Sequence, residues 1–275
     1  MSEEAQGIRI RHRGHAPQVH PTAYVAPTAT LVGDVRVGPR ARVMYGAVLD
    51  AEGSRIEVGE AAVICENAVL RGSAVAGDQP VLVGDHVFVG PHATLLGCEV
   101  DRCVYVATGA TVLQRARLGA GSVVAVGALV HARTVVPEEY FVPPCTVALD
   151  APVRLLAPDD PGLAQAVGRV GFAQVAFSVD AEWTDRISRN EHIAEVRAAE
   201  FGTHADDEVL GFGWRSSNAP CTPREDSDRI DDAGEAHDDS VTVDDPRVAQ
   251  GAVERHASEG SAQDSPADAH MKGRP

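Results

Sequence analysis

The sequence predicts a mainly β protein: a parallel β-helix, then an α-helical segment, then a disordered acidic tail. Apolar and small residues recur every six positions through residues 20–156. Apolar residues then recur at helical spacing within 157–212. Residues 213–275 combine Asp, Ser, Gly and Pro with no periodicity. These three observations give the order of the elements. Residues 1–19 are expected to be a lead-in before the first coil.

The six-residue repeat is clearest in VGDHVF and VGPHAT (83–94) and in VLQRAR, LGAGSV and VAVGAL (112–129). Position one is Val, Ile or Leu, and position five is Ala, Ser, Thr or Val. A chain that turns a corner every six residues forms a triangular coil of about eighteen residues, and coils must stack to bury their inner face. We expect position one to point inward and position five to fit near a corner. The repeat breaks at 49–59 and 70–84, which are predicted loops.

The helical segment contains two apolar stretches, LAQAVGRVGFAQVAF (163–177) and AEWTDRISRNEHIAEVRAAEF (181–201). They predict two helices, or one long and one short, with Thr184 or Asp180 capping the second. We expect the segment to run back over the β-helix of its own subunit and to protect the terminal coil. The apolar residues at helical spacing are Leu163, Val167, Val170 and Phe172 in the first stretch, and Trp183, Ile187 and Ile193 in the second.

The composition excludes several classes of protein. No apolar run approaches the roughly 20 residues of a membrane span, and the net charge of −16 argues against nucleic-acid binding. The N-terminus has no secretory signal pattern. Five cysteines without a CxxC pair argue against a disulfide scaffold or a structural zinc knuckle. We therefore expect free thiols in a cytoplasmic protein that has no nucleic-acid or membrane partner.

The acidic charge is concentrated in the tail. Residues 216–275 hold fourteen Asp or Glu and six Lys or Arg, a net of −8, which is half of the total of −16. A segment of this composition has too little apolar surface to fold by itself. We interpret it as a solvated extension, with an acidic interaction tail as the alternative.

Residues 20–156 resemble the γ-class carbonic anhydrase-like branch of the hexapeptide-repeat superfamily. The resemblance rests on the repeat, the two loops, VGPHATLLGCEVDRCVYVATGATVL (89–113) and GALVHARTVVPEEYFVPP (127–144). It implies a left-handed β-helix and a homotrimer with sites at the subunit interfaces. The flat faces of a β-helix also favour self-association, because they expose aliphatic residues.

The resemblance implies three zinc-ligating histidines, and this chain has none of them. The segments that carry the ligands read VGEAAVICENAVLR (58–71) and GPHATLLGC (90–98), so the three positions hold Arg71, Pro91 and Leu96. None of these side chains is a zinc ligand. We therefore predict no zinc, no other cofactor and no carbonic anhydrase activity, since that chemistry needs a metal to lower the pKa of bound water.

Charged positions around the lost ligands have changed as well. Asp50-Ala51-Glu52 stands where the family has R-G-D, and Cys65-Glu66 stands where it has Gln-Asp. We hypothesise that Arg71 pairs with Asp50, Glu52 or Glu66, within a subunit or across the interface. The alternative is that Arg71 faces a pocket and binds a small anionic ligand. The candidate interface pocket consists of Asp50, Glu52, Cys65, Glu66, Arg71 and His92.

Three functions stay open, and the sequence does not decide whether the protein is an enzyme. The favoured one is a trimeric, non-hydratase binding or scaffold protein with a pocket near Arg71. The alternative is an acyl- or acetyltransferase using acyl-coenzyme A, which needs a general base, although neither loop holds a histidine. The lesser alternative is a metalloenzyme whose ligands have moved to His86, His92, Cys98 or Glu66. The remaining histidines are interpreted as a polar edge (His12, His15, His20) and as an outward-facing coil residue (His131).

Overall fold

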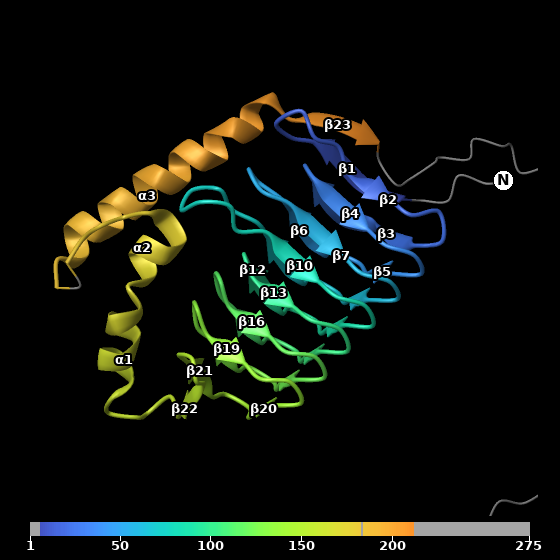
Figure 1. Cartoon of the computed structure of the whole chain (residues 1–275). Coiled ribbons are helices and arrows are strands. Elements are labelled where there is room, and N and C mark those ends of the chain that lie inside the picture. Colours follow the sequence, from blue (N-terminus) through green and yellow to red (C-terminus); the bar gives the residue numbers. More distant parts are fainter. Residues whose placement is uncertain (1–5, 183, 212–275) are drawn as a thin grey trace, which may run out of the picture. The chain divides into compact units, whose positions relative to one another are not determined.

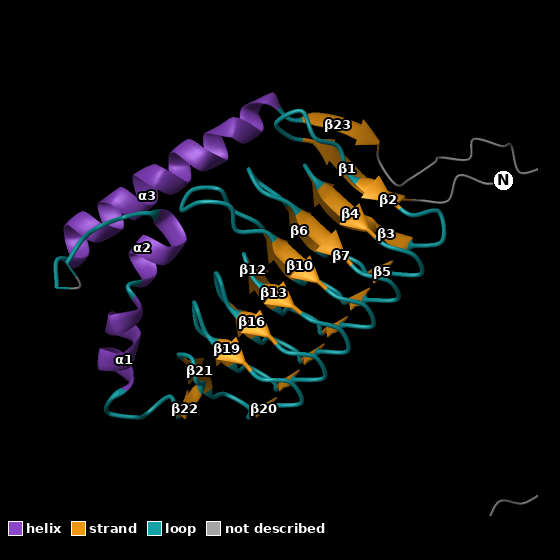
Figure 2. Ribbon diagram, viewed as in Figure 1, coloured by secondary structure: helices purple, strands orange, loops and turns teal. Residues whose placement is uncertain are grey.

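The computed structural model describes residues 6–182 and 184–211 (Figure 1). The predicted acidic tail and Trp183 lie outside the described residues. Within them the chain forms a parallel β-helix with α-helices along one side (Figure 2). The predicted mainly β fold is therefore confirmed. No helix in the described part of the chain is long and apolar enough to cross a membrane.

The β-helix has three faces, each a ladder of short parallel strands. The charged face contains β2 (Gln18–Val19), β4 (Val35–Val37), β7 (Ile56–Val58), β10 (Val81–Val83), β13 (Glu99–Val100), β16 (Arg117–Leu118) and β19 (Val135–Val136). The aromatic face contains the start of β3 (Tyr24–Val32), then β5 (Arg42–Val43), β8 (Val63–Ile64), β11 (Phe88–Val89), β14 (Tyr105–Val106), β17 (Val123–Val124) and β20 (Phe141–Val142). The third face contains the end of β3, then β6 (Val48–Asp50), β9 (Val69–Arg71), β12 (Thr94–Leu96), β15 (Thr111–Val112), β18 (Leu129–Val130) and β21 (Val147–Leu149).

Stacking of the coils buries one continuous aliphatic core. On the third face Leu49, Leu70 and Leu95 lie in register, and each is fully buried. Position five of the repeat supplies the small corner residues, such as Ala93 and Ala110, which are also fully buried. Both sequence predictions for these positions are confirmed. Burial of this aliphatic surface stabilises the solenoid by roughly 25 cal/mol per Å² removed from water.

Corners of the coil use left-handed backbone conformations. Gly109, Gly127 and Cys145 occupy equivalent places in three successive coils, with φ of 66°, 64° and 53°. Glycine adopts this region without strain because it lacks a Cβ atom. The glycine that recurs at position two of the repeat has a different cause, because a Cβ atom at Gly84 or Gly90 would lie 2.8 Å from the backbone of the next coil.

The C-terminal segment forms three helices rather than two: α1 (Leu163–Val170), α2 (Phe172–Phe177) and α3 (Arg186–Gly202). Gly171, with φ of 64°, ends α1 and separates it from α2. Thr184 and Asp180 do not cap α3, because the side chain of Asp185 accepts the hydrogen bond from the Ser188 amide. Thr and Asp side chains can both cap a helix N-terminus, so the sequence alone does not decide which of the neighbouring candidates is the cap.

The helices pack on their own β-helix, as expected. Leu163, Val167 and Val170 of α1 pack against Val147 and Leu149 of β21. In contrast, Ile187 of α3, one of the apolar residues at helical spacing, is 76% exposed. Figure 1 shows α3 running back along the solenoid towards its N-terminal end.

Both ends of the described chain add strands that were not predicted. β1 (Gln6–Arg11) pairs in parallel with β3, so residues 6–11 are part of the sheet rather than a simple lead-in. After the 3-10 helix η1 (Thr203–Asp206), β23 (Glu208–Gly211) pairs antiparallel with β1. At the other end, β22 (Arg154–Leu156) pairs antiparallel with β21. The segments before and after the β-helix thus meet beside its first coil.

Candidate functional site

The candidate site lies at the corner where β6 and β9 end. Asp50 and Arg71 are register partners on neighbouring strands, and Leu96 follows Arg71 on the next strand. Arg71 Nε lies 3.5 Å from Asp50 Oδ2 and 3.3 Å from Glu52 Oε1. The structure therefore contains the ion pairs that were hypothesised for Arg71, and it forms them within one chain.

Helix α3 supplies a second arginine to this corner. Arg197 makes a bidentate contact with Glu52, at 3.0 Å from Nη1 to Oε2 and 2.7 Å from Nη2 to Oε1. The ring of Phe201, one helical turn later, lies 4.2 Å from the Arg197 guanidinium carbon and 5.3 Å from that of Arg71. We call Asp50, Glu52, Arg71, Arg197 and Phe201 the Arg71 cluster.

The charges of the Arg71 cluster balance in a nearly dry environment. The side chain of Glu52 is 1% exposed and that of Asp50 is 7% exposed. A buried carboxylate without a partner is strongly destabilising. Here two guanidinium groups face two carboxylates, and the Glu52 amide also donates to Asp50 Oδ1 at 3.0 Å. The ion pairs of the Arg71 cluster therefore connect the β-helix to α3.

A second polar group joins the two ends of the described chain next to this cluster. His12 donates from Nδ1 to Asp207 Oδ1 at 2.6 Å, and His204 donates from Nδ1 to Asp207 Oδ2 at 2.9 Å. The two imidazole rings stack 4.2 Å apart. His204 Nε2 also lies 3.8 Å from Asp50 Oδ2, which connects this group to the Arg71 cluster. His12 is 1% exposed, so its prediction as a polar edge residue is wrong.

His12, His204 and Asp207 offer three potential ligand atoms within reach of one another. Their geometry is nevertheless that of hydrogen bonds. The nitrogen-to-oxygen distances are 2.6 and 2.9 Å, and the rings are inclined by only 18°. Nearly parallel stacked rings do not aim their nitrogen lone pairs at a common point between them, as a metal requires. This group is therefore better described as a hydrogen-bonded contact between the two ends of the described chain than as a metal centre.

A cavity of about 170 Å³, partly open to solvent, lies between the Arg71 corner and the helices. Its polar side carries both arginines of the cluster together with Ser73 and Gln114. Its apolar side is formed by Leu96 and by residues of α2. The full lining is Arg71, Gly72, Ser73, Leu96, Gln114, Phe172, Ala176, Phe177 and Arg197.

Two buried polar atoms of the cavity lining lack a hydrogen-bond partner. These are Arg71 Nε, a donor, and Gln114 Oε1, an acceptor. Gln114 is only 6% exposed. Buried polar groups in native proteins are nearly always hydrogen-bonded, so each exception needs an explanation. Both atoms are covered by neighbouring protein atoms rather than exposed to the cavity.

The other predicted pocket residues lie at a different corner. Cys65 and Glu66 precede β9, whereas Arg71 is the last residue of that strand. The backbone amide of the exposed His92 donates a hydrogen bond to the Glu66 carbonyl at 3.0 Å. Burial and then the neighbouring Glu66 raise the pKa of the buried Cys65 thiol. Pro91 is next to His92 at this corner. Within one chain the predicted pocket is therefore divided between two corners.

The displaced metal site receives no support from the described residues. His86 is exposed at a corner of its own, where its amide donates to the Glu60 carbonyl. Cys98 is buried in the core, and burial raises the pKa of its thiol. His86, His92, Cys98 and Glu66 do not form a metal-ligating group in residues 6–182 and 184–211.

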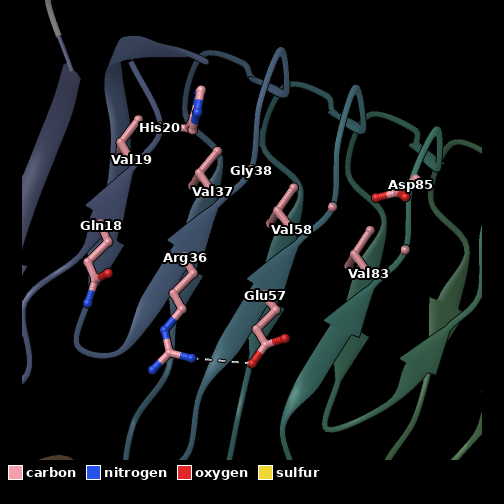
Figure 3. Close-up of a pocket in the computed structure, with 12 residues that line it drawn as sticks. Gln18, Val19, His20, Arg36, Val37, Gly38, Glu57, Val58, Val83 and Asp85 are labelled. Atoms are coloured by element: carbon pink, nitrogen blue, oxygen red, sulfur yellow. Dashed lines mark ion pairs between the residues drawn. The ribbon is translucent and has the colours of Figure 1, made fainter. Parts of the chain in front are cut away.

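A larger open groove, of about 600 Å³, crosses the charged face (Figure 3). Arg36 and Glu57 extend from neighbouring strands there and form an ion pair of 3.6 Å. Its other lining residues include His20 and Asp85. The described residues that line this groove contain no buried polar side-chain atom that lacks a hydrogen-bond partner. The cavity at Arg71, which has two arginines in its lining, is the better candidate for an anion site.

His131 lies beneath α2, and its prediction as an outward residue is wrong. It is 4% exposed, and its ring meets the edge of Phe172 at 5.7 Å. Burial lowers its pKa from the usual value near 6.5, although Asp150 acts in the opposite direction. His131 thus supports the helix that covers the cavity, and it does so as a neutral imidazole.

No protein-family model matches the chain. It is 35% identical over 126 residues to "Gamma carbonic anhydrase 1, mitochondrial" of Arabidopsis thaliana, covering 45% of this chain and 46% of the relative. It is 34% identical over 119 residues to "Carnitine operon protein CaiE" of Escherichia coli strain K12, covering 43% of this chain and 59% of the relative. The chain therefore spans about half the length of the curated relatives it matches.

Solved structures with a similar outline include a hexapeptide transferase family protein from Anaplasma phagocytophilum. It is 24% identical, has a TM-score of 0.45, and covers 68% of this chain and 95% of its own. A putative acetyltransferase from Bacillus cereus is 19% identical with a TM-score of 0.46, covering 72% of this chain and 99% of its own.

We predict that protonation of His131 destabilises the fold. The unfolded chain takes up this proton near pH 6.5, whereas the buried imidazole takes it up only at lower pH. The free energy of unfolding should therefore fall as the pH is lowered from 8 to 5, with a slope of up to about 1.4 kcal/mol per pH unit from this group. Urea unfolding of the parent and of His131→Gln measures it.

The His131→Gln protein should lose that part of the pH dependence. The exposed His92→Gln variant is the matched control and should keep it. Identical pH dependence in the parent and in His131→Gln would show that burial of His131 is not linked to stability.

Proposed function

We propose that this chain, a hexapeptide-repeat protein similar to the γ-class carbonic anhydrases, is a trimeric binding protein without carbonic anhydrase activity. In this proposal a small anionic ligand binds in the cavity next to Arg71. The observation that carries the proposal is the Arg71 cluster: a guanidinium group paired with Asp50 and Glu52 stands where the resemblance puts a zinc ligand.

The side chains at this corner do not fit a zinc ion. Arg71 and Leu96 are register partners, and neither has a nitrogen, sulfur or carboxylate atom that ligates zinc. A cation would also be repelled by the guanidinium groups of Arg71 and Arg197. Hydration of carbon dioxide on this fold would require a metal-bound hydroxide, whereas the carboxylates at this corner, Asp50 and Glu52, are paired with arginines.

The cavity differs from the interface pocket that the sequence predicts. Residues of one chain form its walls, with Arg71 and Leu96 from the β-helix and Phe172 and Arg197 from the helices. We therefore place the ligand beneath the chain's own helices rather than between subunits. A guanidinium group suits an anion because it presents several donors in a fixed plane.

Trimer formation is supported by the contrast between two faces of the β-helix. The outward residues of the aromatic face include Phe88, Tyr105 and Phe141, and the first two stack at 4.9 Å. Phe141 is 55% exposed and Tyr105 is 46% exposed. On the charged face, Arg117 pairs with Glu99 instead. A row of exposed rings on a flat face favours burial against another copy of the chain.

Acyl transfer is supported less well. His204 is the histidine that contacts the Arg71 cluster, and a transferase would need such a group as a general base. Its Nδ1 faces Asp207 at 2.9 Å and its Nε2 faces Asp50 at 3.8 Å. With carboxylates at both nitrogens, the imidazole is held as a donor and has no nitrogen directed at an acceptor substrate.

We predict that protein expressed without a histidine tag in zinc- and iron-supplemented medium contains less than about 0.1 metal per chain, because the three family ligand positions hold Arg71, Pro91 and Leu96 and the nearby carboxylates are paired with arginines. Elemental analysis measures this, and a carbon dioxide hydration assay with added zinc should stay at the uncatalysed rate. About one metal per chain, or zinc-dependent hydration, would overturn the proposal.

We predict that Tyr105→Glu converts a trimer to monomers, because a carboxylate on the aromatic face would be buried without a partner. Val135→Glu is the matched control, since Val135 is similarly exposed, at 41%, on the charged face. Sedimentation analysis of the two variants and the parent tests this. A monomeric parent, or equal dissociation of both variants, would contradict the proposed interface.

A further inference from the structure

We infer that the anion site next to Arg71 takes up a proton together with its ligand, and that His204 is the group that receives this proton. The inference rests on the proposed anion-binding function and adds its dependence on pH. It follows from a chain of contacts in which one carboxylate oxygen faces both an arginine of the cavity lining and the imidazole of His204.

The shared oxygen is Oδ2 of Asp50. Arg71 Nε lies 3.5 Å from this oxygen, and His204 Nε2 lies 3.8 Å from it. The other oxygen of the same carboxylate, Oδ1, accepts the hydrogen bond from the Glu52 amide. The side chain of Arg71 lines the cavity and is 32% exposed, so a ligand there can reach it. Asp50 is therefore the group through which the charge of His204 acts on the anion site.

A neutral imidazole leaves the contact between His204 and Asp50 unmade. His204 Nδ1 donates to Asp207 Oδ2 at 2.9 Å. Because a neutral imidazole has one donor and one acceptor nitrogen, its Nε2 then turns a lone pair towards the Asp50 carboxylate. A proton from the buffer, bound to that lone pair, replaces the repulsion with a charge-assisted attraction. Imidazole is the side chain whose charge ordinarily changes between about pH 5 and 8.

The charges along this chain of contacts are unequal when His204 is neutral. Three carboxylates then face two guanidinium groups: Asp50, Glu52 and Asp207 against Arg71 and Arg197. An incoming anion therefore meets one excess negative charge, and a proton on His204 removes that excess. The anion thus favours the protonated imidazole, and by reciprocity the proton favours binding of the anion.

The second imidazole of this group, His12, is the poorer acceptor for the proton. It stacks on His204 at 4.2 Å and shares Asp207 with it, so a charge on both rings would be repulsive. The side chain of His12 is 1% exposed, against 26% for that of His204. Its Nε2 faces the Thr203 hydroxyl group at 3.4 Å rather than a carboxylate. The proton therefore goes to His204.

The other charged groups on the elements around His204 cancel in pairs. Arg13 pairs with Glu200 of α3 at 3.1 Å. Arg11 of β1 pairs with Glu208 of β23 at 2.7 Å. Each pair combines opposite charges, so neither changes the excess that the proton removes.

Calorimetric titration of the full chain with formate, in buffers of different ionisation enthalpy, measures the protons taken up on binding. Formate stays ionised from pH 6 to 8, and formamide is a neutral probe of similar shape. We expect uptake of about 0.3 to 1 proton per formate at pH 7, and an affinity that falls at least threefold from pH 6 to 8, because one linked proton allows at most about tenfold per pH unit. Formamide should bind more weakly and take up no proton.

His204→Gln should bind formate without proton uptake and with an affinity that does not change with pH. The matched control is His192→Gln, which removes an exposed histidine of α3 and should keep the uptake of the parent. His131→Gln should keep it too, which separates this inference from the titration of the histidine beneath α2. Circular dichroism confirms that each variant is folded. If His204→Gln is not, NMR titration of the parent's imidazole resonances, with and without formate, identifies the same proton.

The remaining outcomes separate this inference from the function on which it rests. Formate binding without proton uptake in the parent would overturn the inference and leave the proposed anion site intact. Uptake that persists in His204→Gln, or that is lost in His131→Gln instead, would overturn the assignment to His204. Binding of neither formate nor acetate to the folded parent between pH 6 and 8 would overturn the anion site, and the inference with it.

Discussion

The burial of the Glu52 carboxylate is the constraint on which the candidate site depends. Its side chain is 1% exposed, so its charge must be balanced by cations that are fixed in place. One of them, Arg71, comes from the neighbouring coil, and the other, Arg197, comes from α3. Because Glu52 needs both, α3 must lie across this corner of the β-helix. The position of α3 and α2 in turn forms one side of the cavity.

The β-helix makes this arrangement possible because its strands are in register. Asp50 and Arg71 end neighbouring strands of the third face, so their side chains meet without any adjustment of the backbone. The same register aligns Leu96 with Arg71. Asp50, Arg71 and Leu96 thus meet at one corner, where the Arg71 guanidinium group supplies a positive charge and Asp50 and Glu52 balance it.

The sequence predicts most of the scaffold and only half of the site. The six-residue period predicts stacked coils, and the resemblance singles out Arg71 with Asp50, Glu52 or Glu66 as its partners; the structure pairs Arg71 with Asp50 and Glu52. Arg197 pairs with Glu52 across 145 residues, and His12 pairs with Asp207 across 195. Such contacts depend on how the helices dock, which no local pattern encodes. The one available signal is the spacing of Arg197 and Phe201, which places them on one face of α3, with His204 following in η1. The cavity at Arg71 has the same origin, because half of its wall belongs to the docked helices.

The coupling energy between Glu52 and Arg197 tests most directly whether this ion pair holds α3 on the β-helix. Urea unfolding of Glu52→Gln, Arg197→Gln and the double variant gives this energy, and the exposed pair Glu99 and Arg117 provides a matched cycle. We expect a coupling of about 1–3 kcal/mol for the buried pair and about 0–1 kcal/mol for the exposed pair. A coupling within about 0.3 kcal/mol of zero for Glu52 and Arg197 would contradict the central role of this interaction.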